Sequence, residues 1–220
     1  RNAIMLRTLG VLGGMGPLAT ASFMNQVIAL SPAKNDQEHI PMFIRNIPQI
    51  PDRTKFLMGL EDENPFFELK KGFKELTSLG VSCIVIPCNT AHYWYDALTK
   101  NADVHTISIV KSVIKQVKAT GKQKVGILAT TATLNMGIYQ NAFKQHNIDF
   151  VEPNPQQQAA IMDGITAVKA GDLNKGRHLL SKAYDLMLAQ GADCVLFGCT
   201  EIPLVLNEQA KHSPNTCLDT

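Results

Sequence analysis

The chain has 220 residues, 45% of them apolar, which is enough to fill the core of one large domain or two small ones. Lysine and arginine total 21 against 19 aspartates and glutamates, so the charge balance favours neither nucleic acid nor an anionic membrane as a partner. No stretch approaches the roughly 20 apolar residues of a membrane span, and the N-terminus carries no apolar signal core. We therefore expect a cytoplasmic protein that binds a small molecule.

The first half of the chain alternates apolar runs with amphipathic segments. The run at residues 9–12 closes in a glycine-rich turn at residues 13–16, and Pro17 stands where a helix begins without needing its N–H. Residues 46–53 include two prolines and are expected to form an irregular loop of the kind that often carries function. Residues 1–4, which precede Met5, are set aside from the fold prediction. The expected strands cover residues 9–12, 41–44, 83–86 and 104–107, and the expected helices cover residues 17–30, 65–79, 92–99 and 110–119.

The pattern restarts in the second half of the chain. Residues 124–131 repeat the strand-and-turn design of residues 8–15, and Gly126 lies 116 residues after Gly10. This alternation predicts an α/β fold of two pseudo-symmetric Rossmann-like α/β/α domains, each with a mainly parallel sheet, and an active site in the interdomain cleft. The first domain is expected over residues 1–104 and the second over residues 105–212. Three strands are expected in the second domain: one that begins at residue 124, one at residues 149–151 and one at residues 194–197. The helices expected there cover residues 136–146, 156–170 and 173–190.

Two cysteines follow apolar runs of the same design, Cys88 in the first half and Cys199 in the second. Ligands of parallel α/β sheets bind beyond the carboxyl ends of the strands, so the pseudo-symmetry brings both thiols to the cleft. A helix that begins after each cysteine favours the thiolate, and both are predicted to act as bases or nucleophiles. The other cysteines, Cys83, Cys194 and Cys217, are expected to be structural. The five lack the tight Cys-x-x-Cys spacing of a zinc site.

Five ordered motifs span almost the whole chain: residues 12–20 (LGGMGPLAT), 48–54 (PQIPDRT), 87–92 (PCNTAH), 168–171 (VKAG) and 198–201 (GCTE). Together they resemble the aspartate/glutamate racemase family, most closely its aspartate racemase branch. Glutamate racemases would be expected to have a histidine after the second Cys-Thr, where this chain has Glu201. The resemblance implies a homodimeric enzyme that interconverts L- and D-aspartate, with glutamate as an alternative substrate, and uses no pyridoxal phosphate, other cofactor or metal. It also implies that residues 213–220 lead into a helix that returns to the first domain.

The chemistry of racemisation explains why two thiols are wanted. Inverting an α-carbon without a cofactor requires a base on one face of the carbon and an acid on the other. The resemblance implies that Cys199 takes the proton from the L-isomer and Cys88 takes it from the D-isomer. Backbone N–H groups at the two helix N-termini, with Asn89, Thr90 and Thr200, are expected to bind the α-carboxylate.

The resemblance also implies the remaining site residues. Arg53 and Lys169 are expected to clamp the side-chain carboxylate, which suits a bidentate arginine. Two neighbours of the cysteines stay open, because His92 either orients a thiolate or caps a helix, and Glu201 would raise the pKa of Cys199 unless it points away. The other implied substrate-binding residues are Met15 in the first turn and Thr130, Thr131 and Thr133 in the second half, at least one of which is expected to be a helix cap.

Other classes of protein fit part of the pattern. Residues 14–19 satisfy the Gly-x-Gly-x-x-Ala form of a dinucleotide-binding oxidoreductase, but the expected ribose-binding acid at the end of the next strand is missing. A two-lobed binding protein of the periplasmic type would leave the paired thiols unexplained. A broad-specificity amino-acid racemase or a related superfamily isomerase also remains an alternative.

Overall fold

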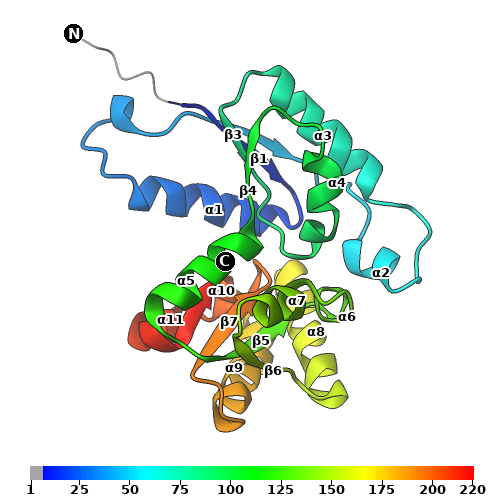
Figure 1. Cartoon of the computed structure of the whole chain (residues 1–220), viewed down its shortest axis with the longest axis vertical. Helices are drawn as coiled ribbons and strands as arrows, with labels where there is room; N and C mark the ends of the chain where they lie inside the picture. Colours follow the sequence, from blue (N-terminus) through cyan, green and yellow to red (C-terminus); the bar gives the residue numbers. More distant parts are fainter. Residues whose placement is uncertain (1–6) are drawn as a thin grey trace.

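The computed structural model describes residues 7–220, so residues 1–4 lie outside the described part of the chain. It has two lobes, each built on a four-stranded parallel sheet (Figure 1). The strand order is β2-β1-β3-β4 in the first sheet and β6-β5-β7-β8 in the second, which is the same topology used twice. The predicted α/β fold of two pseudo-symmetric domains is therefore confirmed.

The first lobe contains β1 (Leu9–Gly13), α1 (Pro17–Leu30), η1 (Asp36–Glu38), β2 (Met42–Asn46), α2 (Arg53–Leu57), α3 (Phe66–Ser78), β3 (Cys83–Val85), η2 (Thr90–Trp94), α4 (Tyr95–Thr99) and β4 (His105–Ile107). The second begins with α5 (Ile109–Thr120), β5 (Lys124–Ala129), α6 (Thr131–Asn135), α7 (Ile138–Gln145), β6 (Asp149–Val151), α8 (Pro155–Lys169) and α9 (Leu173–Ala189). It ends with β7 (Cys194–Gly198), α10 (Ile202–Val205), α11 (Asn207–His212), η3 (Pro214–Thr216) and β8 (Cys217–Asp219).

The expected domain boundaries differ from the pairing of the strands. β4 pairs with β3 from His105 to Ile107, so the first sheet runs past the boundary expected at residue 104. Residues 213–220 were expected to return to the first domain, but β8 pairs in parallel with β7 and completes the second sheet. The apolar Leu218 is 4% exposed there, which explains why this segment stays with the second lobe.

The two sheets differ in how their faces are covered. Alternate residues of the second sheet belong to two core clusters: Leu128 packs with α8 and α9, whereas Ile127 packs with α5 and α7. The first sheet has one such cluster among the described residues, in which Leu12 and Ile84 pack with α3. The second sheet is therefore enclosed on both faces, as parallel sheets usually are.

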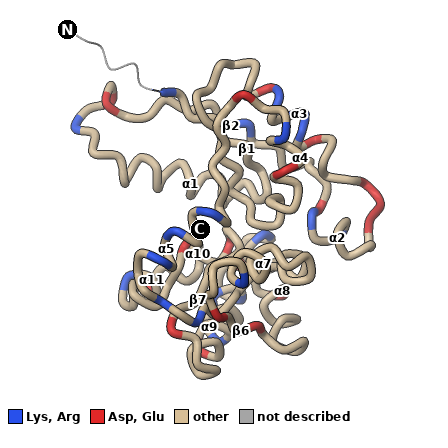
Figure 2. Tube along the Cα trace, in the orientation of Figure 1, with Lys and Arg blue, Asp and Glu red and all other residues tan. Residues whose placement is uncertain are grey.

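Helix α1 is the least covered long helix of the first lobe. Its 14 residues carry no charge (Figure 2), yet only Ala19 and Thr20 are buried, and Leu30 is 82% exposed. Exposed apolar side chains are usually scattered singly over a protein surface, whereas on α1 they are grouped on one helix. No helix within residues 7–220 combines the length and apolar character that a membrane span requires.

Candidate active site

The two predicted thiols occupy equivalent places in the two lobes. Cys88 lies three residues beyond the end of β3, and Cys199 directly follows β7, the strand with the same position in the second sheet. Both are buried and both line one cavity of about 60 Å³ between the lobes. The other lining residues that the sequence predicted are Met15, Arg53, Asn89, Thr90, Thr130, Lys169 and Thr200.

The turn after β1 has no room for a side chain at Gly14. Gly14 has a φ of +103°, and a Cβ atom there would lie 2.4 Å from the backbone of Ile47. Its N–H donates to the Thr20 hydroxyl at 2.9 Å, which ties the turn to the first turn of α1. This close approach of two backbones holds Met15, which is 2% exposed, against the cavity.

Hydroxyl groups join the two lobes behind the cysteines. The Thr90 hydroxyl lies 2.8 Å from that of Thr130 and 3.1 Å from that of Thr133. Thr130 is also the N-cap of α6, where its Oγ1 accepts from the N–H of Thr133, so the expected helix cap is found at this residue. These contacts fix the position of Thr90 relative to the second lobe.

Two of the predicted threonines do not line the cavity. Thr133 is fully buried and serves the hydroxyl cluster just described. Thr131 directs its N–H to the sulfur of Met162, and its hydroxyl accepts from the amide of Gln158. Their role in substrate binding stays a prediction: Thr131 is bonded to two residues of α8, whereas Thr133 is bonded to the hydroxyls of Thr90 and Thr130.

The carboxamide of Asn89 lies between the cavity and the second lobe. Its oxygen accepts a hydrogen bond from the hydroxyl of the buried Tyr139, and its nitrogen donates to the Thr220 hydroxyl at 3.0 Å. Asn89 therefore already holds partners from the second lobe while it lines the cavity. Burial raises the pKa of Tyr139, so its phenol stays protonated and donates.

Arg53 begins a helix where the sequence indicated an irregular loop. Asp52 is the N-cap of α2, and its carboxylate accepts from the N–H of Lys55 at 2.9 Å. The Arg53 Nη1 donates to the carbonyl oxygens of Ile50 and Pro51 at 3.0 and 2.9 Å, whereas its buried Nε has no partner among the described residues. The guanidinium is thus held in place by Nη1, and its other three N–H groups, one on Nε and two on Nη2, have no hydrogen-bond partner among the described residues.

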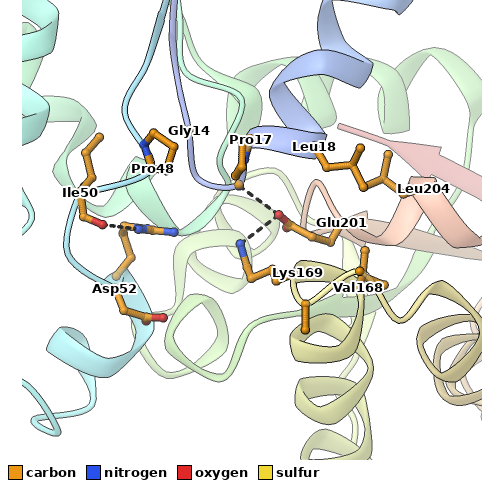
Figure 3. Close-up of a pocket in the computed structure, with 14 residues that line it drawn as sticks. Gly14, Pro17, Leu18, Pro48, Ile50, Asp52, Val168, Lys169, Glu201 and Leu204 are labelled. Carbon is orange, nitrogen blue, oxygen red and sulfur yellow. Dashed lines mark hydrogen bonds and ion pairs between the residues drawn. The ribbon is translucent and has the colours of Figure 1, made fainter.

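Lys169 and Glu201, which line this cavity, form an ion pair that is visible in a view of the larger cavity next to it (Figure 3). Glu201, whose side chain is 3% exposed, receives four donors. The Lys169 Nζ at 2.9 Å and the Gly16 N–H at 3.0 Å donate to Oε1, and the Cys199 Sγ at 3.0 Å and the Thr200 hydroxyl at 3.5 Å donate to Oε2. An outer cavity of about 540 Å³ lies next to the inner one, and Arg53, Lys169 and Glu201 line both. Glu201 therefore points into the site, which settles the question left open by the sequence.

The contacts with Glu201 and Lys169 influence the protonation state of Cys199. Burial and the neighbouring Glu201 carboxylate raise the pKa of Cys199 well above its ordinary value, although Lys169 opposes them. The expectation that a following helix favours the thiolate is wrong at Cys199, because α10 has only four residues and the carboxylate is closer. Burial is the largest single influence on Lys169 and lowers its pKa, but the charge and hydrogen bond of Glu201 together with the two neighbouring cysteines outweigh it, so the net change is upward. In this structure the site therefore combines a cationic amine with a neutral thiol.

His92 caps a helix and does not face a thiolate. Its Nε2 accepts from the N–H of Ile109, the first residue of α5, at 3.1 Å. Its Nδ1 lies 2.8 Å from the Cys88 carbonyl oxygen and must therefore carry the proton and donate. Burial lowers the pKa of His92 to about 4, so the neutral ring joins the Cys88 turn to the helix that enters the second lobe.

One face of α8 supplies cavity residues that the sequence reading missed. Met162, Ile165 and Thr166 line the cavity together with Lys169. Their spacing of three and four residues places them on one side of a helix, which is the signal that would have found them once Lys169 was chosen. Asp52 and Thr54, on either side of Arg53, also line the cavity.

Residues 12–220 match the family model described as Asp/Glu/Hydantoin racemase. The chain belongs to this family. It is 29% identical over 214 residues to the broad specificity amino-acid racemase RacX of Bacillus subtilis, covering 94% of this chain and 90% of that protein. The structure of the Picrophilus torridus aspartate racemase superposes with a TM-score of 0.87 at 29% identity, over 97% of this chain and 88% of that one.

A more distant member of the family shares the fold. Glutamate racemase of Francisella tularensis, solved in complex with D-glutamate, superposes with a TM-score of 0.68 at 20% identity, over 97% of this chain and 76% of that one. The resemblance to aspartate/glutamate racemases that the five motifs indicated is confirmed by the family match.

Proposed function

We propose that this racemase interconverts L- and D-aspartate by two-base proton transfer between Cys88 and Cys199. The observation that carries the proposal is that both thiols, from equivalent strand ends of two opposed lobes, line one cavity. One thiol takes the α-proton as a thiolate while the other returns a proton from the opposite face of the carbon. In the direction from L to D, Cys199 takes the proton and Cys88 returns one, and the roles exchange in the reverse direction.

The negative charge that develops on the substrate spreads into its α-carboxylate and must be stabilised there. The Thr90 and Thr200 hydroxyls line the inner cavity and are the proposed donors to this group. Asn89, which already binds Tyr139 and Thr220, acts mainly by fixing the Cys88 turn. Arg53 and Lys169 bind the second carboxylate, since they are the cations that line the inner cavity among residues 7–220.

An acidic substrate of the size of aspartate fits these features better than a neutral or larger amino acid. The inner cavity of about 60 Å³ is small, and two cations face it. The structural relative with 29% identity is an aspartate racemase, and the curated relative with 29% identity is a broad specificity amino-acid racemase. Glutamate and a broader range therefore remain the alternatives to test, because one methylene changes binding by only about 1–3 kcal/mol.

The site also weighs against the dinucleotide-binding alternative. A pyrophosphate would bind the N–H groups at the start of α1. In this chain the Gly16 N–H donates to the buried Glu201 carboxylate at 3.0 Å. That negative charge would repel a phosphate at the same place.

Substitution of each thiol tests the proposal. We expect Cys88→Ala and Cys199→Ala each to lower racemisation of aspartate by at least about 10²- to 10⁴-fold, the usual loss for a general acid or base. Chiral chromatography after incubation with L-aspartate, D-aspartate and a panel of other L-amino acids measures both the rate and the substrate range. Cys83→Ala, a substitution at a partly buried cysteine that does not line the cavity, is the matched control. Normal racemisation by either of the first two variants would rule out the two-base assignment.

Three further expectations stay predictions: independence from pyridoxal phosphate, a cytoplasmic location and a homodimer. Helix α1 is the surface that we propose a second copy covers, since it is uncharged and largely exposed. A sedimentation coefficient that corresponds to a single 24.1 kDa chain would exclude the dimer.

A further inference from the structure

Glu201 gathers donors from three distant parts of the chain. The Gly16 N–H comes from the turn after β1, the Lys169 ammonium from the end of α8, and the Cys199 thiol from the end of β7. Both carboxylate oxygens are used: Oε1 accepts from the first two donors, and Oε2 accepts from the thiol at 3.0 Å and, at the longer distance of 3.5 Å, from the Thr200 hydroxyl. The carboxylate thus bridges one proposed base and one proposed substrate-binding cation.

An ordinary buried ion pair would need less than this. The Gly16 N–H and the Lys169 ammonium both bind Oε1, and these two contacts alone would stabilise the buried negative charge of Glu201. The position of Oε2 would not matter for this purpose. Instead, Oε2 lies 3.0 Å from Sγ of Cys199, two residues earlier in the chain. A Cβ atom on Gly16 would lie 3.1 Å from Oε1, so the absence of a side chain at this residue leaves the carboxylate its place.

We infer that Glu201 is a positioning residue that holds Cys199 as the thiol and ties it to Lys169, so that the two bases of the racemase are unequal before substrate binds. This inference rests on the proposed function and adds to it a residue with no place in the two-base scheme. No proton moves to Glu201: its carboxylate accepts the S–H hydrogen bond, and the proton stays on sulfur.

All the titratable groups that face Cys199 bear on this state. The Glu201 carboxylate disfavours a second negative charge beside it, and the Lys169 ammonium partly compensates. The remaining groups of this kind around the inner cavity are Cys88 from the β3 turn, Asp52 and Arg53 from the start of α2, and the phenol of Tyr139 from α7. None of the four is hydrogen-bonded to the Cys199 sulfur, so Glu201 is the group whose charge controls it most directly.

If Glu201 makes the two bases unequal, the kinetics of the two enantiomers differ, whereas a purely structural role of Glu201 would have no such effect. The two enantiomers have equal free energy, so kcat/KM must be the same for both at every pH. Each enantiomer nevertheless binds the form of the enzyme in which its own base is the thiolate. The enantiomer that gives its proton to Cys199 binds the rarer form and has the higher KM and the higher kcat.

The variant Glu201→Gln tests the inference because it keeps the shape and an acceptor oxygen but removes the charge. We expect the pH midpoint of Cys199 ionisation to fall by about 1–3 pH units, the usual effect of removing a like charge in contact. The midpoint is followed by the ultraviolet absorbance of the thiolate, with the Cys199→Ala version of each protein subtracted. The ratio of the KM values for the two aspartate enantiomers should move toward one.

Two further variants complete the experiment. Glu208→Gln makes the same chemical change on the exposed surface of α11 and should leave the midpoint and the KM ratio unchanged. Lys169→Gln removes the compensating cation and should move the midpoint upward, which provides an independent reading if Glu201→Gln does not fold. Circular dichroism verifies the fold of each variant.

An unchanged Cys199 midpoint in folded Glu201→Gln, or an unchanged midpoint in Lys169→Gln, would overturn the inference. Absence of racemisation in the unmodified protein would instead contradict the proposed function. The absorbance titration uses no substrate, so it reports on Glu201 in either case.

Discussion

At Cys199, burial and a carboxylate in contact both favour the thiol over the thiolate. Two thiols that share one cavity titrate as a pair, and the active form is the one that holds a single proton between them. A site that keeps one member protonated extends the pH range over which this form persists. In the proposed mechanism Glu201, two residues after Cys199, therefore makes the two bases unequal although they follow equivalent strands.

His92 provides a pH test of stability. Its pKa is about 4 in the folded protein against an ordinary value of 6.5, so the unfolded chain binds a proton at this residue before the folded chain does. Stability is then fully present above about pH 6.5 and falls as the pH is lowered toward 4. At about 1.4 kcal/mol per pH unit, the loss that belongs to this ring is about 3 kcal/mol.

The measurement is urea unfolding at pH 7 and at pH 4.5 for the unmodified protein and for His92→Gln. We expect the variant to be less stable at pH 7, because the bonds to Cys88 and Ile109 are weakened, but to lose less stability on acidification. His178→Gln, on the exposed side of α9, is the matched control and should follow the unmodified protein. An equal loss in all three proteins would show that His92 is not the group responsible.

At the scale of elements, the turn between β1 and α1 depends on one glycine. Gly14→Ala would place a side chain on a residue with a φ of +103° and 2.4 Å from the backbone of Ile47. We expect it to lower the free energy of unfolding by about 2–4 kcal/mol, from backbone strain together with overpacking. Thermal and urea denaturation measure the change.

Gly59→Ala separates these two causes. Gly59 also has a positive φ, +71°, but a Cβ atom there would meet nothing within 4 Å. The Gly59→Ala substitution should lower the free energy of unfolding only through the strain of a left-handed backbone at alanine, by about 1–2 kcal/mol. If the two alanine variants were equally stable, the close approach of Gly14 to Ile47 would have no energetic weight.

The sequence predicted the long helices and most strands, including the three-residue β6, but it missed several short helices and strand β8. Helix α1 begins at Pro17 and ends at Leu30 as predicted, since Pro17 and the Ser31-Pro32 pair mark both ends. Helix α2, with five residues, was missed, although Asp52 is a good N-cap, because the prolines before it favoured a loop reading. Strand β8 has three residues and is specified by its partner β7, which local sequence does not reveal.

For the site residues, the sequence predicted those that belong to a local motif and not those whose position depends on distant parts of the chain. Residues next to the cysteines, such as Thr90 and Thr200, were found because they belong to recognisable motifs at strand ends. The direction of the Glu201 side chain was not predictable, since it depends on Lys169 and Gly16, which are far away in the sequence. Thr131 and Thr133 do not line the cavity, because their hydrogen bonds to α8 and to the hydroxyls of Thr90 and Thr130 are tertiary contacts that the sequence does not show.

At the scale of the molecule, the duplicated topology explains why the two thiols meet. The order β2-β1-β3-β4 recurs as β6-β5-β7-β8, and each cysteine follows the strand beside the first strand of its sheet. The lobes are joined at this place by Thr90 with Thr130 and by Asn89 with Tyr139. Facing lobes thus present their strand ends to opposite sides of one small cavity, which is the arrangement that inversion of a tetrahedral carbon requires.

Racemisation of L-aspartate in deuterium oxide tests this account most directly. With two bases, the proton that one thiol removes is not the one that the other returns, so the first D-aspartate formed should carry deuterium at its α-carbon. The L-aspartate that has not reacted should still carry protium, and chiral separation followed by mass spectrometry reads both. D-aspartate that retains the original α-proton at early times, or no D-aspartate at all, would contradict the account.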